Sequence, residues 1–360
     1  MSARSRIWQL AAGAAGAAAA GTAAVSVARY RRVMARHGAG ETVRFGSLRS
    51  PARTVVADDG VPLHVEVDEY AAPRGQLGRG PGEPPLTVVF CHGYALNLDC
   101  WHFQRAGYRG LVRSVYYDQR SHGRSGRSPR GNATIDQLGR DLRQVLDEVV
   151  PEGPVVLVGH SMGGMSIIAL VEQFPELVGD RVVGVGLIAT TAGGLDPSRL
   201  LLPLVPTPLG SRVTGSAVKT LARGHHLVDL ARRLGRSFAT VATDVFAFGD
   251  DVPASYISFV DDMLSATPFA VVAEFFPSFK GLDKFDSVEV LEQVPVSIVC
   301  GTADKLTSVG HSRKLHERIE GSRLLECEGA GHMVMMERHD HVNAEIDQLV
   351  AAATEQVSRR

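Results

Sequence analysis

Apolar runs rich in β-branched residues recur along the chain and are separated by amphipathic stretches. We predict buried strands at residues 86–91, 112–118, 154–158, 182–188, 296–300 and 323–327. An earlier pair, at 54–57 and 63–67, flanks Asp58-Asp59-Gly60 and predicts a β-hairpin with a glycine-containing turn. Strands that are apolar on both faces and alternate with amphipathic helices indicate an α/β fold, with a mostly parallel sheet flanked by helices on both sides.

Helical spacing of apolar residues marks the segments that connect these strands. Thr134 is the predicted N-cap of a helix with one buried face, formed by Ile135, Leu138, Leu142, Val145, Leu146 and Val149. A second helix is predicted from Met162 to about Phe174. The C-terminal helix has a buried stripe of Val342, Ile346, Leu349 and Val350. We assign residues 51–192 and 293–355 to this α/β core.

The alternation of strands and helices lapses between residues 193 and 292. Helix-like runs occupy this interval at residues 217–222, 226–234, 256–264 and 269–275. Sites in parallel α/β sheets form at the carboxyl ends of the strands, so an insertion here is predicted to cover that end as a helical lid. Its apolar stretches, at 200–205 and 269–279, either line a lipophilic pocket or pack the lid onto the core.

Residues 1–40 differ in composition from the rest of the chain. Residues 7–28 carry no charge and are rich in Ala and Gly, with arginines on both sides. This length suits one membrane-spanning helix, which needs about 20 apolar residues. The same features fit a signal peptide cleaved after Ser26-Val27-Ala28, or an Ala-rich leader on a soluble enzyme. We expect a protein anchored in a membrane through residues 7–28, or an exported one, with a cytoplasmic location as the lesser alternative.

The overall composition is that of a globular protein, and it narrows the range of partners. Of 360 residues, 44% are hydrophobic and 21% are charged, and the formal net charge of −1 gives no electrostatic basis for binding nucleic acid. Cys91, Cys100, Cys300 and Cys327 lack the spacing of metal ligands and are predicted to be buried thiols. A Cys91–Cys100 disulfide is the alternative if the protein is exported.

The central candidate for chemistry is Gly159-His160-Ser161-Met162-Gly163-Gly164, directly after the strand at 154–158. A strand that turns sharply into a helix, with serine at the turn, is a nucleophile elbow. The glycines two residues before and after Ser161 are required because a Cβ there would collide with the neighbouring strand or helix. His160 is expected to point away from the site and to serve in packing.

An activated serine needs a histidine base, an acid that orients the histidine, and N–H donors for the oxyanion. Asp304 follows the carboxyl end of the strand at 296–300. His332 stands on a glycine-flanked loop after the strand at 323–327. The chain order Ser161, Asp304, His332 is the order typical of a serine nucleophile on such an elbow. We therefore predict that these three residues form a catalytic triad.

Two backbone N–H groups are predicted as oxyanion donors. That of Met162 begins a helix and gains from its positive end, and that of Tyr94 follows the His92-Gly93 pair. Asp118 is expected to hold a structural turn and not to act as the acid. No metal or organic cofactor is predicted, because the triad itself supplies the nucleophile, the base and the electrostatic stabilisation.

Together, these motifs resemble the α/β-hydrolase-fold serine hydrolases, which are esterase- and lipase-like enzymes. The resemblance is carried by Phe90-Cys91-His92-Gly93, Asp118-x-Arg120-x-His122-Gly123-x-Ser125, the elbow at 159–164, Gly301-x-x-Asp304 and Gly331-His332. It covers about residues 51–355 and implies an eight-stranded sheet with a helical cap. Two departures concern loop geometry. Ser121 stands where the family usually has glycine, and Lys305–Ser308 lacks the proline often found after the acid.

We predict a serine hydrolase that cleaves carboxylic esters of small lipophilic molecules through an acyl-enzyme on Ser161. The resembled family also includes C–C bond hydrolases and cofactor-free haloperoxidases, and these activities are the first alternative. A non-catalytic receptor that binds a small ligand on the same fold is the second. Serine at the elbow argues against epoxide hydrolases and haloalkane dehalogenases, because those members of the family carry aspartate there.

Overall fold

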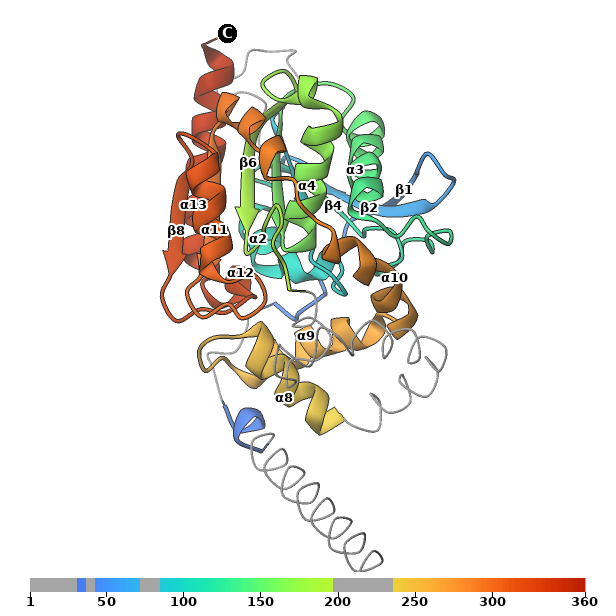
Figure 1. The fold of residues 1–360 in the computed structure, drawn as a ribbon, viewed down its shortest axis with the longest axis vertical. Helices are drawn as coiled ribbons and strands as arrows, with labels where there is room; N and C mark the ends of the chain where they lie inside the picture. The colour runs from blue at the N-terminus through green and yellow to red at the C-terminus, as the bar shows by residue number, and fades with distance from the viewer. Residues whose placement is uncertain (1–30, 37–42, 72–84, 197–235, 360) are drawn as a thin grey trace, which may run out of the picture.

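The computed structural model describes residues 31–36, 43–71, 85–196 and 236–359. The predicted anchor or signal segment at 7–28 lies outside the described residues, as do the apolar stretch at 200–205 and the helical runs at 217–222 and 226–234. Within the described ranges the chain forms an eight-stranded sheet in the order β1-β2-β4-β3-β5-β6-β7-β8. Figure 1 shows helices packed around this sheet.

The strands are β1 (Ala52–Val56), β2 (Pro62–Asp68), β3 (Thr87–Cys91), β4 (Arg113–Tyr117), β5 (Val155–His160), β6 (Val182–Ile188), β7 (Val296–Gly301) and β8 (Arg323–Cys327). Strand β2 is antiparallel to both of its neighbours, and the other paired strands are parallel. The sheet is therefore mixed, and the prediction of a mostly parallel sheet is confirmed. The β1–β2 hairpin turns at Gly60, which has a φ of +85°.

Successive residues of the central strands alternate between two apolar layers, as the pleat requires. On β3, Val88 and Phe90 join one layer, while Val89 and Cys91 join the other. The first layer is covered by α2 (His102–Tyr108), α12 (Val334–Glu337) and α13 (His339–Ser358), and the second by α3 (Ile135–Val149), α4 (Met162–Gln173) and α11 (Val309–Arg318). Helices on both faces explain why the central strands are almost continuously apolar.

Between β6 and β7 the described residues form three α-helices, α8 (Arg236–Ala247), α9 (Ala254–Ala266) and α10 (Phe269–Lys280), which we call the cap helices. They gather beyond the end of the sheet toward which β6 and β8 point, the carboxyl end (Figure 1). The helical runs predicted at 256–264 and 269–275 are parts of α9 and α10. Among the described residues no single helix is long and apolar enough to cross a membrane, although α9 and α10, bent by 89°, pass that test as a pair.

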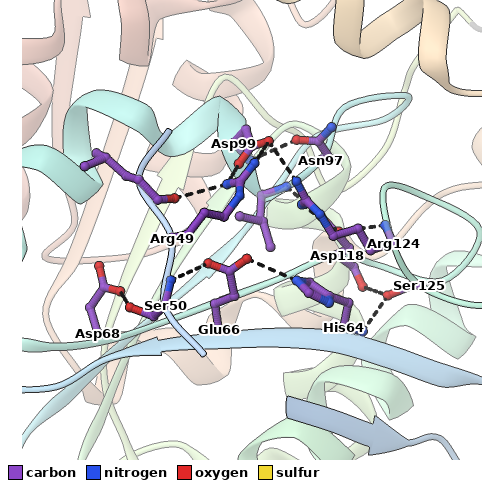
Figure 2. A network of polar contacts seen from close by, with 12 residues as sticks. Arg49, Ser50, His64, Glu66, Asp68, Asn97, Asp99, Asp118, Arg124 and Ser125 are labelled. Atoms are coloured by element: carbon purple, nitrogen blue, oxygen red, sulfur yellow. Dashed lines mark hydrogen bonds and ion pairs between the residues drawn. The ribbon is translucent and has the colours of Figure 1, made fainter. Parts of the chain in front are cut away.

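A polar network fastens the chain ahead of β1 to the sheet and to the loops at its carboxyl end (Figure 2). The backbone N–H of Ser50 donates to Glu66 Oε2 at 3.0 Å, and its hydroxyl donates to Asp68 Oδ1 at 2.5 Å. Both terminal nitrogens of Arg49 bind the carboxylate of Asp99, which lies in the short 3₁₀-helix Leu98–Trp101 after β3. This segment is thus held at two successive residues.

The same two carboxylates, Glu66 and Asp68, also bind the buried charge of Arg105. Arg105 Nη1 is 2.8 Å from Glu66 Oε2, and Nη2 is 2.7 Å from Asp68 Oδ1, with all three side chains at most 2% exposed. His64 Nε2 is 3.1 Å from Glu66 Oε1 and donates to it, because an ionised carboxylate can only accept. Burial alone would raise the pKa of Glu66, but the hydrogen bonds from His64, Ser50 and Arg105 outweigh burial and lower it to about 2.

Replacing Glu66 with glutamine, Glu66→Gln, is expected to lower the free energy of unfolding at pH 7 by about 2–3 kcal/mol, because buried Arg105 keeps only one carboxylate partner. A carboxylate whose pKa falls on folding stabilises the protein above its unfolded pKa and loses that effect as the pH falls. The difference between wild type and variant should therefore shrink between about pH 4.5 and about pH 2. Urea unfolding at several pH values measures it, and a difference independent of pH would contradict this role.

Candidate active site

Ser161 lies at the turn between β5 and α4, with φ +53° and ψ −118°. Such a conformation costs a residue other than glycine about 1–3 kcal/mol and persists only where the surroundings impose it. Here α4 packs directly on the end of β3, since a Cβ on Gly163 would lie 2.0 Å from the carbonyl oxygen of Cys91. A Cβ on Gly159 would lie 2.6 Å from the backbone of Gly163. The backbone thus has the sharp strand-to-helix turn that the two glycines predict.

Asp304 and His332 are brought together from the loops after β7 and β8. His332 Nδ1 lies 2.9 Å from Asp304 Oδ2, and both side chains are buried. The other carboxylate oxygen of Asp304 accepts from the backbone N–H groups of Leu306, at 2.8 Å, and Thr307, at 3.0 Å. Since the carboxylate only accepts, the proton of neutral His332 is on Nδ1, and Nε2 is the basic nitrogen.

Thr307 is a residue of this site that sequence reasoning missed. Its hydroxyl oxygen lies 2.9 Å from Asp304 Oδ2, 2.8 Å from the carbonyl oxygen of Ala189 and 3.3 Å from His332 Nδ1. Ala189 directly follows β6, so the hydroxyl ties the acid to the end of the neighbouring strand. A threonine three residues after the acid, in the stretch that lacks proline, is the signal that could have located this contact.

The residue before Ser161 contacts the backbone of His332. His160 Nε2 lies 3.0 Å from the carbonyl oxygen of His332, and the two ring centroids are 4.8 Å apart. Burial lowers the pKa of His160 well below its ordinary value, so the ring is neutral, and a carbonyl partner requires the proton on Nε2. The predicted orientation of His160 away from the site is therefore wrong, because its ring faces the loop of His332 and donates a hydrogen bond to it.

The two predicted oxyanion residues lie at equivalent positions after two neighbouring strands. Strands β3 and β5 are parallel, with Cys91 opposite Gly159, and Tyr94 and Met162 each lie three residues further along. Met162 is the first residue of α4, so its N–H belongs to the first turn, where backbone donors have no partner within the helix. The hydroxyl of Tyr94 donates to the carbonyl of Val272 in α10, which ties this loop to the cap helices.

A buried hydrogen-bonded group holds the loop after β3 against α4. His92 Nδ1 donates to the carbonyl of Gly93 at 2.7 Å, and Nε2 accepts from the backbone N–H of Gln119 at 2.9 Å. The side chain of Gln119 donates back to the carbonyl of His92 at 2.5 Å and lies 2.7 Å from the hydroxyl of Ser166 in α4. Burial lowers the pKa of His92 to about 4, so the ring stays neutral. The sequence motifs do not single out Gln119 or Ser166.

Asp118 has the structural role predicted for it. Its two carboxylate oxygens accept from the backbone N–H groups of Leu98 and Arg124, each at 2.8 Å. Ser121, in the same turn, has a φ of +66°, which is the left-handed conformation that favours glycine. Its hydroxyl accepts from the N–H of Ser128 at 2.8 Å, a contact that glycine would not make. The departure from the family pattern is therefore accommodated in the turn.

The four cysteines are free and buried, so the predicted thiols are observed and the alternative Cys91–Cys100 disulfide is not. Burial raises the pKa of Cys91 to about 12 and that of Cys300 to about 11, which keeps both protonated at neutral pH. In the described part of the chain, no group of three or more His, Cys, Asp or Glu side chains is arranged to hold a metal ion.

The sequence is similar to proteins of known and of unknown activity. An uncharacterised protein of Mycobacterium tuberculosis is 28% identical over 262 residues, which cover 71% of this chain and 71% of that protein. A monoacylglycerol lipase of Mycolicibacterium smegmatis is 26% identical over 243 residues, which cover 66% and 76%. A non-heme chloroperoxidase of Kitasatospora aureofaciens is 40% identical over 91 residues, which cover 24% and 30%.

Solved structures share the fold. An esterase from Rhodococcus sp. has a TM-score of 0.65 at 18% identity and covers 84% of this chain and 99% of its own. The enol-lactonase of Burkholderia xenovorans has a TM-score of 0.62 at 21% identity and covers 83% and 99%. At these identities the likeness concerns the fold alone. The sequence matches one family over residues 88–345, well over half of its length, and the protein therefore belongs to the alpha/beta hydrolase family.

Proposed function

We propose that the protein is a serine hydrolase that cleaves carboxylic esters of small lipophilic molecules through an acyl-enzyme on Ser161. The observation that carries the proposal is the 2.9 Å contact between His332 Nδ1 and Asp304 Oδ2, which makes Nε2 the basic nitrogen. His160, the neighbour of Ser161, binds the backbone of that same histidine. The strained Ser161 is thus linked to the oriented base through His160, the residue directly before it.

In the proposed reaction, His332 Nε2 accepts the proton of Ser161 as the serine oxygen attacks the ester carbonyl. The N–H groups of Met162 and Tyr94 bind the oxyanion, and loss of one such donor typically costs about 3–4 kcal/mol in the transition state. Asp304 stabilises the imidazolium, which then protonates the leaving alcohol as the C–O bond breaks. Water, deprotonated by His332, attacks the acyl-enzyme and releases the carboxylic acid and Ser161.

The apolar surroundings of Tyr94 support a lipophilic substrate. Its ring packs against Phe279 of α10 with centroids 4.9 Å apart, and Phe275 of α10 and Met162 belong to the same apolar cluster. The residue that supplies one proposed oxyanion donor therefore sits beneath cap helix α10. Similarity to a monoacylglycerol lipase is consistent with an ester of this kind. We also propose that the cap helices act as a lid over the site. Separately, from the sequence of residues 7–28 alone, we propose that the protein associates with a membrane or is exported.

Hydrolysis of p-nitrophenyl esters from acetyl to palmitoyl tests the proposed function. Wild type is expected to prefer medium or long acyl chains, and Ser161→Ala should lower kcat by about 10⁶-fold with folding intact, because the nucleophile is lost. Ser322→Ala, which alters a serine before β8, is the matched control and should keep full activity. Near-normal turnover by Ser161→Ala would refute the mechanism, and failure of a fluorophosphonate to label Ser161 would favour a non-catalytic receptor.

The substitution Thr307→Val tests whether the Thr307 hydroxyl helps Asp304 to act as the acid of the triad. Valine keeps the shape of threonine but removes the hydroxyl that donates to Asp304 Oδ2. A hydrogen bond to a charged group contributes about 1.5 kcal/mol or more. The kcat is expected to fall about tenfold while KM changes little, because Thr307 contacts the acid and not the proposed substrate site. Steady-state kinetics on one ester measures both constants. A rise in KM at unchanged kcat would place Thr307 in substrate binding instead.

A cofactor-free haloperoxidase is the second candidate, because a chloroperoxidase is 40% identical over 91 residues. The same triad would act on a different co-substrate, hydrogen peroxide in place of water. Bromination of a dione in acetate buffer that contains bromide and hydrogen peroxide, by wild type and Ser161→Ala, separates the two candidates, because the peracid released from the acyl-enzyme oxidises bromide. Bromination that depends on Ser161, without appreciable ester hydrolysis, would replace the esterase proposal.

A further inference from the structure

The loop that carries His332, residues 328–333, lies directly against the cap. The N–H of Met333 donates to the carbonyl of Ala247, the last residue of α8, at 2.8 Å. Gly249 and Gly331 meet backbone to backbone. A Cβ on Gly249 would lie 2.1 Å from the carbonyl oxygen of Gly329, and one on Gly331 would lie 2.4 Å from the nitrogen of Gly249. Because no side chain separates the two segments, a displacement of one must displace the other.

One carboxylate bridges these segments. Glu337, the last residue of α12, accepts through Oε2 from the N–H groups of Gly249, at 3.1 Å, and Asp250, at 3.2 Å. Its Oε1 accepts from the N–H of Gly331 at 2.6 Å. The neighbouring Arg338 pairs with Asp250 and donates to the carbonyl of Glu328 at 3.0 Å. One oxygen of Glu337 therefore holds the cap, and the other holds the loop of the base.

The backbone around His332 is fixed on three successive residues. The N–H of Gly331 is held by Glu337, the carbonyl of His332 by His160, and the N–H of Met333 by Ala247. His160 belongs to the core, whereas Ala247 belongs to the cap and Glu337 binds it. One of these three attachments therefore comes from the cap, and a second comes from a carboxylate that also binds the cap.

We propose that Glu337 is a positioning residue that couples the cap to the catalytic base. By holding Gly249 and Asp250 on one oxygen and Gly331 on the other, its carboxylate keeps His332 aligned with Ser161 while the cap is seated. A cap that shifts at residues 247–250 moves the base away from the nucleophile. This inference rests on the proposed serine hydrolase function and deepens it, since it makes the rate of the chemical step depend on the cap.

Glu337→Gln is the test, because glutamine has nearly the same shape but only one oxygen. Whichever way the amide points, its NH₂ group faces an N–H donor, so either the cap or the loop of His332 is released. With p-nitrophenyl acetate, a small ester, kcat is expected to fall about tenfold with little change in KM. The second-order rate constant for labelling of Ser161 by a fluorophosphonate should fall by the same factor.

Glu345→Gln is the matched control. Glu345 is a buried carboxylate of α13 that accepts from the hydroxyl of Ser297 at 2.8 Å and from Arg323 Nε at 2.9 Å, away from the loop of His332. This substitution makes the same chemical change and is expected to lower Tm while leaving kcat and the labelling rate at wild-type values. A loss of kcat in both variants in proportion to the loss of Tm would overturn the proposal, because it would show a purely structural role.

The outcomes separate this inference from the proposed function. Labelling of Ser161 in wild type, with an equal rate in Glu337→Gln, overturns the coupling alone. Absence of labelling in wild type overturns the hydrolase and the coupling with it. If Glu337→Gln does not fold, Arg338→Gln weakens the same junction from the surface, and a smaller fall in kcat is expected. An unchanged kcat in Arg338→Gln would then overturn the coupling.

Discussion

The close approach of α4 to the end of β3 is the constraint on which the candidate site depends. It brings the backbone of Gly163 against Cys91, imposes the strained conformation of Ser161, and sets Met162 level with Tyr94. The energy that holds this strain comes from the apolar layers on both faces of the sheet, which fix β3, β5 and α4 as one body. A local rearrangement at Ser161 would therefore have to disturb the core.

Two neutral histidines, His92 and His160, connect loops around the candidate site. Burial lowers the pKa of His92 and of His160, so each ring offers one donor and one acceptor at neutral pH. His92 uses both to join Gly93 to Gln119, and His160 uses its donor to hold His332. A neutral imidazole can bridge two backbone groups without the desolvation cost of a buried charge. Histidine thus serves here as a rigid bridge between segments distant in sequence.

The sequence predicts the sheet well because the signal is local. The strands predicted at 182–188 and 323–327 have the bounds of β6 and β8, and the predicted pairing of Asp304 with His332 is observed. Residues such as Thr307, Gln119 and Glu337 were not predicted, since their roles arise from contacts with partners far along the chain or on a neighbouring strand end. His160 shows the same limit, because only the fold reveals that its ring meets a carbonyl 172 positions away.

The junction at residues 247–250 also bears on how caps can be exchanged within this fold. Cap segments that enter after β6 can differ in length and sequence, since the interval between two strands of a sheet tolerates insertion. The turn between α8 and α9, inside the cap, is not equally permissive, because Gly249 has to lie flat on the backbone of the neighbouring loop. A chimera that grafts a foreign segment after β6 should therefore replace only the chain ahead of Ala247 and keep the native chain, with α9 and α10, from Ala247 onward.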